Sequence, residues 1–244
     1  MSGAARGYFP RGLAQPEAGY RFSLDALLLA CFSPTPVGAR LLDLGCGCGV
    51  VGLGMVLRQP DMHLTGVDLN PEMVQAAGEN AGLLGLGEQC VFFENDVAQL
   101  RGKKSAVSPE TYSVVVANPP YRSPQAGRAS PYAGRQQARF APGAALETFV
   151  DAAAYALANR GRFACVFLAE RLPSLCAVLR QHRLEPKRMR FVHSRAQRPA
   201  KQVLVEARKN SGEQLHVEPP LVLYEAEGLR AETVTFCPYL GCNA

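Results

Sequence analysis

The chain lacks the features that place a protein in or across a membrane. No apolar run among its 244 residues reaches roughly 18, the length that a membrane-spanning helix needs. Residues 1–10 contain no continuous apolar segment of the kind found in signal peptides. Low-complexity tracts and internal repeats are also missing. We therefore expect a cytoplasmic protein that is one large domain, with or without an appendage, and whose oligomeric state the sequence leaves open.

Metal-binding cysteine pairs are missing as well. The sequence has eight cysteines, and none of them shows the C-x2-C spacing of a zinc site. Cys237 and Cys242 are close in sequence, but the four histidines supply no matching second pair of ligands. We therefore expect no metal centre, and we interpret the cysteines as reduced and mostly buried thiols.

Acidic residues are scarce in two long segments. Residues 160–209 contain 13 of the 26 lysines and arginines and only three acids. Residues 122–139 add four arginines and no acid. Together with a formal net charge of +5, this distribution favours a polyanion partner such as RNA over a merely solvated basic face.

Strand-like and helix-like segments alternate after residue 40, which predicts an α/β fold built from βαβ units around a mostly parallel sheet. The last two strands flank a basic turn and are expected to form an antiparallel pair that closes the sheet. We expect residues 1–40 to be an extension with one apolar helix, 41–210 the main domain, and 211–244 a short strand with a loose tail. The expected strands are 40–44, 63–68, 90–94, 112–117, 161–168, 189–193 and 202–207, and the expected helices are 22–32, 50–59, 70–84, 146–158 and 173–181.

Three glycines follow the first predicted strand. Gly45, Gly47 and Gly49 allow a tight turn in which φ is positive and the backbone approaches a ligand closely. The helix that follows offers free N–H groups at its amino end to an anionic group. The segment therefore predicts a site for a nucleoside cofactor. Its Gly47-x-Gly49-x-x-Gly52 spacing also matches the dinucleotide fingerprint, so a nicotinamide cofactor is an alternative.

Acidic residues at the ends of three successive strands favour one of these cofactors. Asp43, just before the turn, would face an ammonium group but repel a diphosphate. Asp68 ends the second strand and is placed to accept from both ribose hydroxyls. Asp96 follows the third strand and is placed to accept from an adenine amino group. We therefore predict S-adenosylmethionine as the cofactor; the alternative is that Asp43 only caps the turn and Asp96 is a plain loop residue.

The tetrapeptide Asn118-Pro119-Pro120-Tyr121 follows the fourth predicted strand. It therefore lies at the carboxyl edge of the sheet, where α/β proteins bind ligands. An aromatic amine is a poor nucleophile because its lone pair is delocalised into the ring. The Asn118 side-chain oxygen and the Pro119 carbonyl, held rigidly, would accept both N–H bonds and turn that lone pair toward a methyl donor. Tyr121 would stack on a flipped-out base, so the motif predicts methyl transfer to nitrogen.

These motifs together resemble the class I, Rossmann-fold amino-methyltransferases. Within that group, Gly19–Ala30, Phe191–Ala196 and Val203–Lys209 are similar to the tRNA1(Val) adenine-37 N6-methyltransferase family. The resemblance implies a mostly parallel seven-stranded sheet with an antiparallel C-terminal strand. The family commonly has a histidine-containing stretch after the long loop, where this chain has Ala138-Arg139-Phe140-Ala141.

The resemblance also implies roles for residues before the first strand. The helix expected at 22–32 would cap the cofactor, and Ser23 and Asp25 would hold its methionine end. By itself, Asp25 is also explained as an acidic residue at the amino end of a helix.

We expect the enzyme to methylate the exocyclic N6 of an adenosine in RNA. The resemblance implies that this RNA is tRNA and that the adenosine lies near the anticodon. Arg122, Arg195, Arg198 and Lys201 are predicted phosphate contacts by position and charge. A protein glutamine amide has nearly the same NH2 geometry, so a glutamine methyltransferase is one alternative. The enzymes that methylate release factors share the signature but resemble a design with a longer helical domain in front. An RNA-binding or assembly factor with an idle cofactor pocket is the other alternative.

Overall fold

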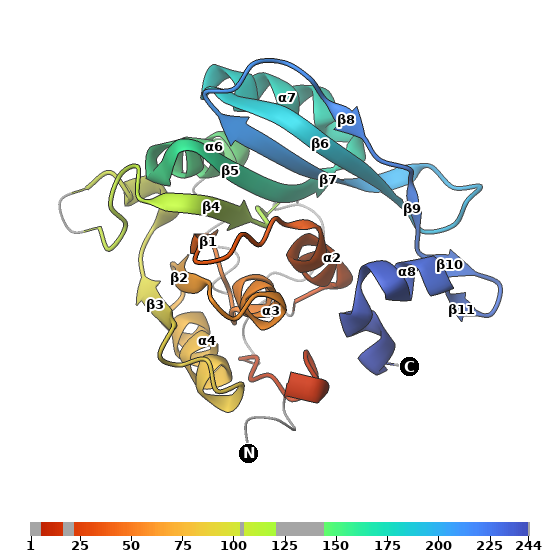
Figure 1. Ribbon diagram of the computed structural model, residues 1–244, viewed down its shortest axis with the longest axis horizontal. Helices are drawn as coiled ribbons and strands as arrows, with labels where there is room; N and C mark the ends of the chain where they lie inside the picture. Colours follow the sequence, from red (N-terminus) through yellow and green to blue (C-terminus); the bar gives the residue numbers. More distant parts are fainter. Residues whose placement is uncertain (1–5, 17–21, 103–104, 121–143, 244) are drawn as a thin grey trace.

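The computed structural model describes residues 6–16, 22–102, 105–120 and 144–243 (Figure 1). A central sheet has the strand order β3-β2-β1-β4-β5-β7-β6-β8, and the short β9 also pairs with β6. The hairpin β10–β11 forms a separate two-stranded sheet. The strands are β1 (Arg40–Leu44), β2 (His63–Asp68), β3 (Cys90–Glu94), β4 (Tyr112–Ala117), β5 (Leu157–Leu168), β6 (Leu184–His193), β7 (Ala200–Lys209), β8 (His216–Val217), β9 (Leu221–Val222), β10 (Tyr224–Glu225) and β11 (Gly228–Leu229).

Five neighbouring strands of the central sheet run parallel. They are β3, β2, β1, β4 and β5. In contrast, β7 is antiparallel to both of its neighbours, β5 and β6. The predicted mostly parallel sheet with an antiparallel C-terminal strand is therefore confirmed. The two-residue strands β8 and β9 extend the sheet beyond the seven longer strands.

Helices cover both faces of the sheet, because the parallel strands are apolar on both sides. Val114, Val115 and Val116 of β4 are all fully buried, although successive side chains point to opposite faces. Helices α2, α3 and α4 pack on one face, and α6 and α7 pack on the other (Figure 1). No helix in the described ranges is long and apolar enough to span a bilayer. The helices are α2 (Leu24–Phe32), α3 (Val50–Arg58), α4 (Pro71–Leu83), α6 (Ala144–Ala156), α7 (Leu172–Gln181) and α8 (Ala231–Phe236), with short 3-10 turns η1 (Val97–Gln99), η2 (Ala169–Arg171) and η3 (Pro238–Asn243).

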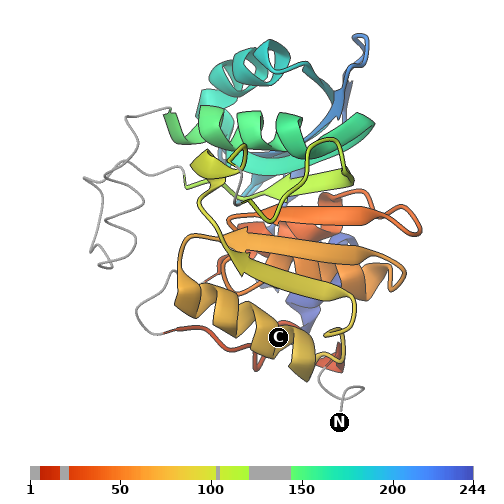
Figure 2. The ribbon, with the colours of Figure 1, turned by 90° about the vertical axis from the view of Figure 1, so that its left-hand side faces the viewer.

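The order of strand addition reverses at β1. From there β2 and β3 extend the sheet to one side, and β4 and β5 extend it to the other. The register pairs Leu44 with Ala117, so the segments after β1 and β4 leave the sheet side by side. Figure 2 shows the arrowheads of β2 and β3 pointing toward the same edge. A crevice at such a reversal is where open α/β sheets bind their ligands.

The C-terminal segment is packed, so the expectation of a loose tail after residue 211 is wrong for the described residues. Cys237 and Leu240 are buried in the same core cluster as α2 and α3. The Tyr239 hydroxyl donates to the Gly54 carbonyl at 2.6 Å, and its ring meets the Phe9 ring edge-on at 4.7 Å between centroids. The elements here are too short to give a periodic sequence pattern, and their stability comes from this tertiary contact.

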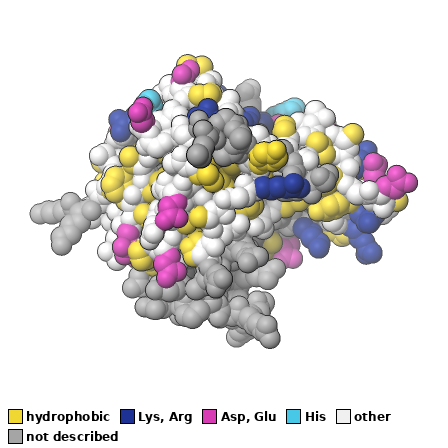
Figure 3. Space-filling model, turned by 90° about the horizontal axis from the view of Figure 1, so that it is seen from below, with side chains coloured by type: hydrophobic (Ala, Val, Ile, Leu, Met, Phe, Trp, Pro, Cys, Tyr) yellow, Lys and Arg dark blue, Asp and Glu magenta, His cyan; other side chains and the backbone are white. Residues whose placement is uncertain are grey.

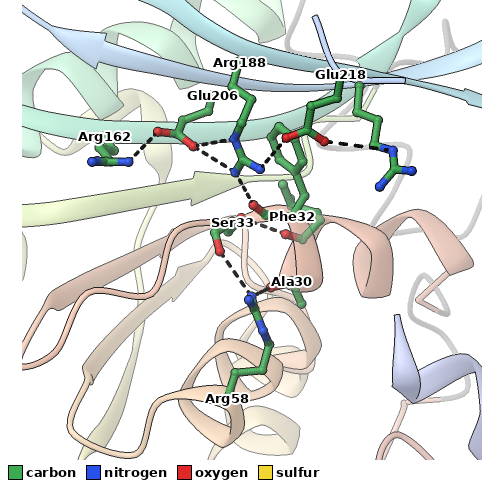
Figure 4. A network of polar contacts seen from close by, with 10 residues as sticks. Ala30, Phe32, Ser33, Arg58, Arg162, Arg188, Glu206 and Glu218 are labelled. Atoms are coloured by element: carbon green, nitrogen blue, oxygen red, sulfur yellow. Dashed lines mark hydrogen bonds and ion pairs between the residues drawn. The ribbon is translucent and has the colours of Figure 1, made fainter. Parts of the chain in front are cut away.

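Arg188 of β6 joins the sheet to the carboxyl end of α2 (Figure 4). Its guanidinium donates to Glu206 at 2.9 and 3.1 Å and to Glu218 at 3.0 Å. It also donates to the Phe32 carbonyl at 2.5 Å and lies 3.9 Å from the centroid of the Phe32 ring. Arg58 of α3 donates to further carbonyls at this helix end. Both arginines therefore satisfy acceptors that the end of a helix leaves unpaired.

Candidate active site

The turn after β1 has the backbone that its glycines predict. Gly45, Gly47 and Gly49 have φ values of +67°, +54° and +85°, in the left-handed region that favours glycine. A Cβ at Gly47 would meet nothing within 4 Å, so the turn is open on that side. A Cβ at Gly49 would lie 3.0 Å from a methyl group of Leu53 and 3.2 Å from Ala77. Gly47 thus leaves room for a ligand, whereas Gly49 allows close packing inside the protein.

Asp68 fastens this turn to the end of β2. Its Oδ2 accepts from the Gly47 N–H and its Oδ1 from the Asn70 N–H, both at 2.9 Å. The side chain is buried, and desolvation raises the pKa of Asp68 above its usual value. A carboxylate has about four lone-pair sites, so these two bonds leave acceptor capacity for hydroxyl groups. The predicted ribose contact is compatible with this geometry and stays a prediction.

Asp43 holds the start of α3 against β1. Its Oδ2 accepts from the Gly52 N–H at 2.9 Å, and burial raises the pKa of Asp43 to about 7. Glycine at position 52 allows α3 to pack closely on the sheet, because a Cβ there would lie 2.6 Å from a methyl group of the buried Leu64. The turn-capping role considered for Asp43 is therefore observed. Its predicted contact with an ammonium group stays a prediction.

Asp96 caps the short turn η1 after β3. Its Oδ1 accepts from the Ala98 N–H at 2.9 Å, and its Oδ2 accepts from Gln99 Nε2 at 3.3 Å. The residue is half-buried and follows the strand that pairs with β2. It therefore lies one strand further along the same edge as Asp68, and its contact with an adenine ring stays a prediction.

Ser23 and Asp25 begin α2 and contact each other. The Ser23 hydroxyl donates to Asp25 Oδ1, and Gln202 Nε2 donates to Asp25 Oδ2 at 3.0 Å. Asp25 is 5% exposed. Gln202 is at the start of β7, opposite Leu168 at the end of β5. The pair therefore lies at the carboxyl edge of β5, as a cofactor-capping role requires, and the role itself stays a prediction.

The Asn118 motif directly follows β4, the strand beside β1. Asn118 is half-buried, Pro119 is buried, and Pro120 is exposed. Since Leu44 pairs with Ala117, the next residues in each chain segment are Gly45 and Asn118. The structure thus brings the predicted amine-binding residue to the glycine turn. Tyr121 and Arg122 lie outside the described residues.

The basic turn between β6 and β7 lies at the carboxyl end of β6. Arg195, Arg198 and Lys201 are exposed there. Arg195 Nη1 donates to the Glu225 carbonyl at 3.1 Å, which fixes the turn against the β10–β11 hairpin. From below, lysine and arginine side chains are visible on the right-hand lobe of the molecule, with acidic side chains at its outer tip (Figure 3). Phosphate binding by these residues stays a prediction.

Asn80 of α4 is a residue near the site that the sequence analysis missed. It is 1% exposed, and its Oδ1 accepts from the Ala14 N–H at 2.7 Å. Its Nδ2 donates to the Ala14 carbonyl at 3.1 Å and to the Cys48 carbonyl at 2.9 Å. Asn80 therefore joins the N-terminal segment to the glycine turn. The available signal was a polar residue on the apolar stripe of α4, between Ala77 and Ala81.

The seven cysteines whose side chains are described are free, and all of them but Cys176 are buried, which confirms the prediction of mostly buried thiols. Burial raises the pKa of Cys48, inside the glycine turn, to about 11, so its thiol stays protonated at neutral pH. Within the described ranges, no group of three or more histidine, cysteine or acidic side chains is arranged to hold a metal ion.

Comparison with known proteins gives matches of three kinds. Residues 24–183 match the model of the methyltransferase small domain family. A tRNA1(Val) (adenine(37)-N6)-methyltransferase from Yersinia pseudotuberculosis is 29% identical over 66% of this chain, and the match spans 61% of that protein. The protein of the same name from Pectobacterium carotovorum is 27% identical over 79% of this chain and 76% of its own length.

Solved structures share the fold at low sequence identity. A predicted O-methyltransferase from Agrobacterium tumefaciens superposes with a TM-score of 0.72 at 20% identity, over 88% of this chain and 96% of that one. A TehB-like SAM-dependent methyltransferase from Corynebacterium glutamicum gives a TM-score of 0.51 at 18% identity, over 86% of this chain and all of that one. The likeness extends over nearly the whole chain.

Proposed function

This chain belongs to the methyltransferase small domain family, and we propose that it methylates the exocyclic N6 of an adenosine in tRNA, near the anticodon. The family match supports the predicted methyltransferase activity, and we infer S-adenosylmethionine as the methyl donor and a nitrogen as the acceptor, as predicted from the sequence. The target nucleotide and the RNA that carries it are the proposed part.

The observation that carries the proposal is the meeting of Asn118-Pro119 with the glycine turn at the β1–β4 edge. The side-chain oxygen of Asn118 and the carbonyl of Pro119 are hydrogen-bond acceptors. Together they accept from both N–H groups of an aromatic amine and leave its lone pair directed away from the ring plane. The prolines limit backbone freedom at this point, so the acceptors are held in place before the substrate binds.

The residues around the turn fit a nucleoside cofactor with an amino acid end. Gly47 leaves open space beside the turn, and a buried carboxylate, Asp68, stands at the end of β2. Asp96 follows the next strand, and Ser23 and Asp25 are at the opposite end of the edge. When bound, S-adenosylmethionine supplies an electrophilic methyl group. These residues hold its ribose, adenine and methionine parts in that order.

The RNA target is supported by charge and by the relatives. Arg195, Arg198 and Lys201 are exposed beside the carboxyl edge, where they can contact phosphates. Two of the matched relatives are named as methylating adenine 37 of tRNA1(Val). A protein glutamine is the competing target, because its amide presents the same NH2 group. The basic turn favours RNA, since a glutamine-bearing loop needs no positive surface.

The decisive experiment compares tRNA and protein as methyl acceptors. The purified protein is incubated with radiolabelled S-adenosylmethionine and with either unmodified bulk tRNA or release factors, and tRNA nucleosides are then analysed by mass spectrometry. We expect label in tRNA as N6-methyladenosine. Label that enters only the protein fraction would refute the RNA target, and no label in either fraction would support the idle-pocket alternative.

The role of Asn118 is tested in the same assay. We expect Asn118→Ala to reduce turnover by a factor of at least about 100, because the amine loses an oriented acceptor, while cofactor affinity stays near normal. Asn159→Ala is the matched control, since Asn159 is an exposed asparagine at the amino end of β5. Loss of cofactor binding in Asn118→Ala would contradict the division of roles.

A further inference from the structure

Asp25 is held by a residue that comes from the far end of the chain. Gln202 Nε2 donates to Asp25 Oδ2 at 3.0 Å, and the two residues are 177 positions apart. The Ser23 hydroxyl donates to the other carboxylate oxygen. Each oxygen of this buried carboxylate therefore has its own donor, one from the N-cap residue of α2 and one from β7.

The backbone places Gln202 firmly. It pairs with Leu168 of β5 on one side and with Val192 of β6 on the other, within a ladder in which β7 is the central strand. Val203 and Leu204, which follow it, are fully buried. The amide of Gln202 is thus presented from a rigid strand, whereas Asp25 is in the first turn of a short helix.

The chemistry of the pair suits the binding of an ammonium group. A glutamine amide is neutral, so it orients the Asp25 carboxylate without cancelling its negative charge. A lysine or arginine in the same place would compete with a cationic ligand for that charge. Two fixed donors also select one rotamer of the carboxylate, which reduces the conformational entropy lost when a ligand binds.

We propose that Gln202 is a positioning residue for the methionine end of the cofactor, acting through Asp25. The proposal rests on the proposed function, in which Asp25 faces that end of S-adenosylmethionine. It extends the site from the N-terminal helix to the strand that follows the basic turn.

The experiment measures the binding of two nucleosides by calorimetry. S-adenosylhomocysteine carries the amino acid end, whereas 5′-methylthioadenosine has the same nucleoside and sulfur without it. We expect Gln202→Leu to weaken the binding of S-adenosylhomocysteine about ten- to a hundredfold, as for one lost hydrogen bond to a charged group, and to change the binding of methylthioadenosine less than about twofold. Gln75→Leu is the matched control. Gln75 is exposed on α4, and its side-chain amide donates to Glu79 within the same helix.

The outcomes separate the inference from the function on which it rests. Equal weakening of both nucleosides would overturn the proposal, since Gln202 would then shape the whole pocket, and unchanged affinity for both would overturn it as well. Asp25→Asn is measured in parallel. If it weakens only S-adenosylhomocysteine while Gln202→Leu has no effect, the positioning role alone fails. If Asp25→Asn changes neither affinity, the assignment of the methionine end fails.

Discussion

Replacing Arg188 by methionine tests how helix α2 is held to the sheet. The change removes both bonds to Glu206, one bond to Glu218 and the bond to the Phe32 carbonyl (Figure 4). Methionine is long and apolar, so it still covers part of the Phe32 ring. The perturbation therefore removes charge and hydrogen bonds while it retains most of the packing.

The magnitude follows from burial. The Glu206 side chain is only 7% exposed, and breaking a buried ion pair costs about 3–5 kcal/mol because one charge is left unpaired. Two features reduce this cost. The Arg188 side chain is 29% exposed, and Arg162 remains on the other Glu206 oxygen at 2.9 Å. We therefore expect the free energy of unfolding to fall by about 3 kcal/mol, the lower end of that range.

The assay is urea unfolding followed by far-UV circular dichroism, since the chain contains no tryptophan. The midpoint should fall while the slope with denaturant stays constant. Arg101→Met is the control, because Arg101 also pairs with a carboxylate through two bonds and contacts an aromatic ring, but its side chain is 58% exposed. Its loss should cost less than about 1 kcal/mol. Equal losses in the two variants would refute the argument from burial.

Two further predictions concern Gly66 of β2, with a control in helix α4, and Asp43 of β1. Gly66→Ala should destabilise the protein by about 1–2 kcal/mol by overpacking, because its Cβ would lie 2.4 Å from the Phe92 ring. Gly78→Ala, whose Cβ meets nothing within 4 Å in the interior of α4, should instead stabilise it by about 0.5–1 kcal/mol in the same urea assay; the same sign for both would contradict this reasoning. For Asp43, burial raises the pKa from 3.8 to about 7, so the folded chain binds more protons than the unfolded chain between these values, and the free energy of unfolding falls as pH rises through them. Asp43→Asn removes this titrating proton, so the free energy of unfolding should fall less steeply between pH 4 and 7. The fall that remains comes from groups such as Asp68, whose pKa is also raised. A fall as steep as in the parent protein would refute the raised pKa of Asp43.

Local patterns were sufficient for the residues at the strand ends. Asp68 and Asn118 were predicted at the carboxyl edge because a buried parallel strand is a short apolar run that ends in polar or turn-forming residues. The positive φ of Gly47 was likewise predictable, since few other residues adopt it. The structure places these residues along neighbouring strands, as the alternation of strands and helices requires.

Contacts between distant segments could not be predicted in the same way. The packing of Tyr239 on Phe9, and the bonds of Asn80 to Ala14, depend on where two separate segments meet in space. Neither segment has a sequence pattern that identifies the segment against which it packs. The C-terminal elements were therefore wrongly predicted to be loose. The hydrogen bonds by which Asn80 joins the N-terminal segment to the glycine turn were not predicted.

The sequence by itself was enough to predict the chemistry proposed for this protein, because the bonding capacity of the glycines, the carboxylates and the Asn118-Pro119 pair, and their distance from a strand end, are local properties of the chain. Only the tertiary structure decided which distant residues hydrogen-bond to these side chains. Gln202 reaches Asp25 because β7 inserts next to β5, and Arg188 reaches the end of α2 across the sheet. Such contacts arise from the strand order. The strand order depends on how the whole core packs, so it cannot be predicted from any short segment of the sequence.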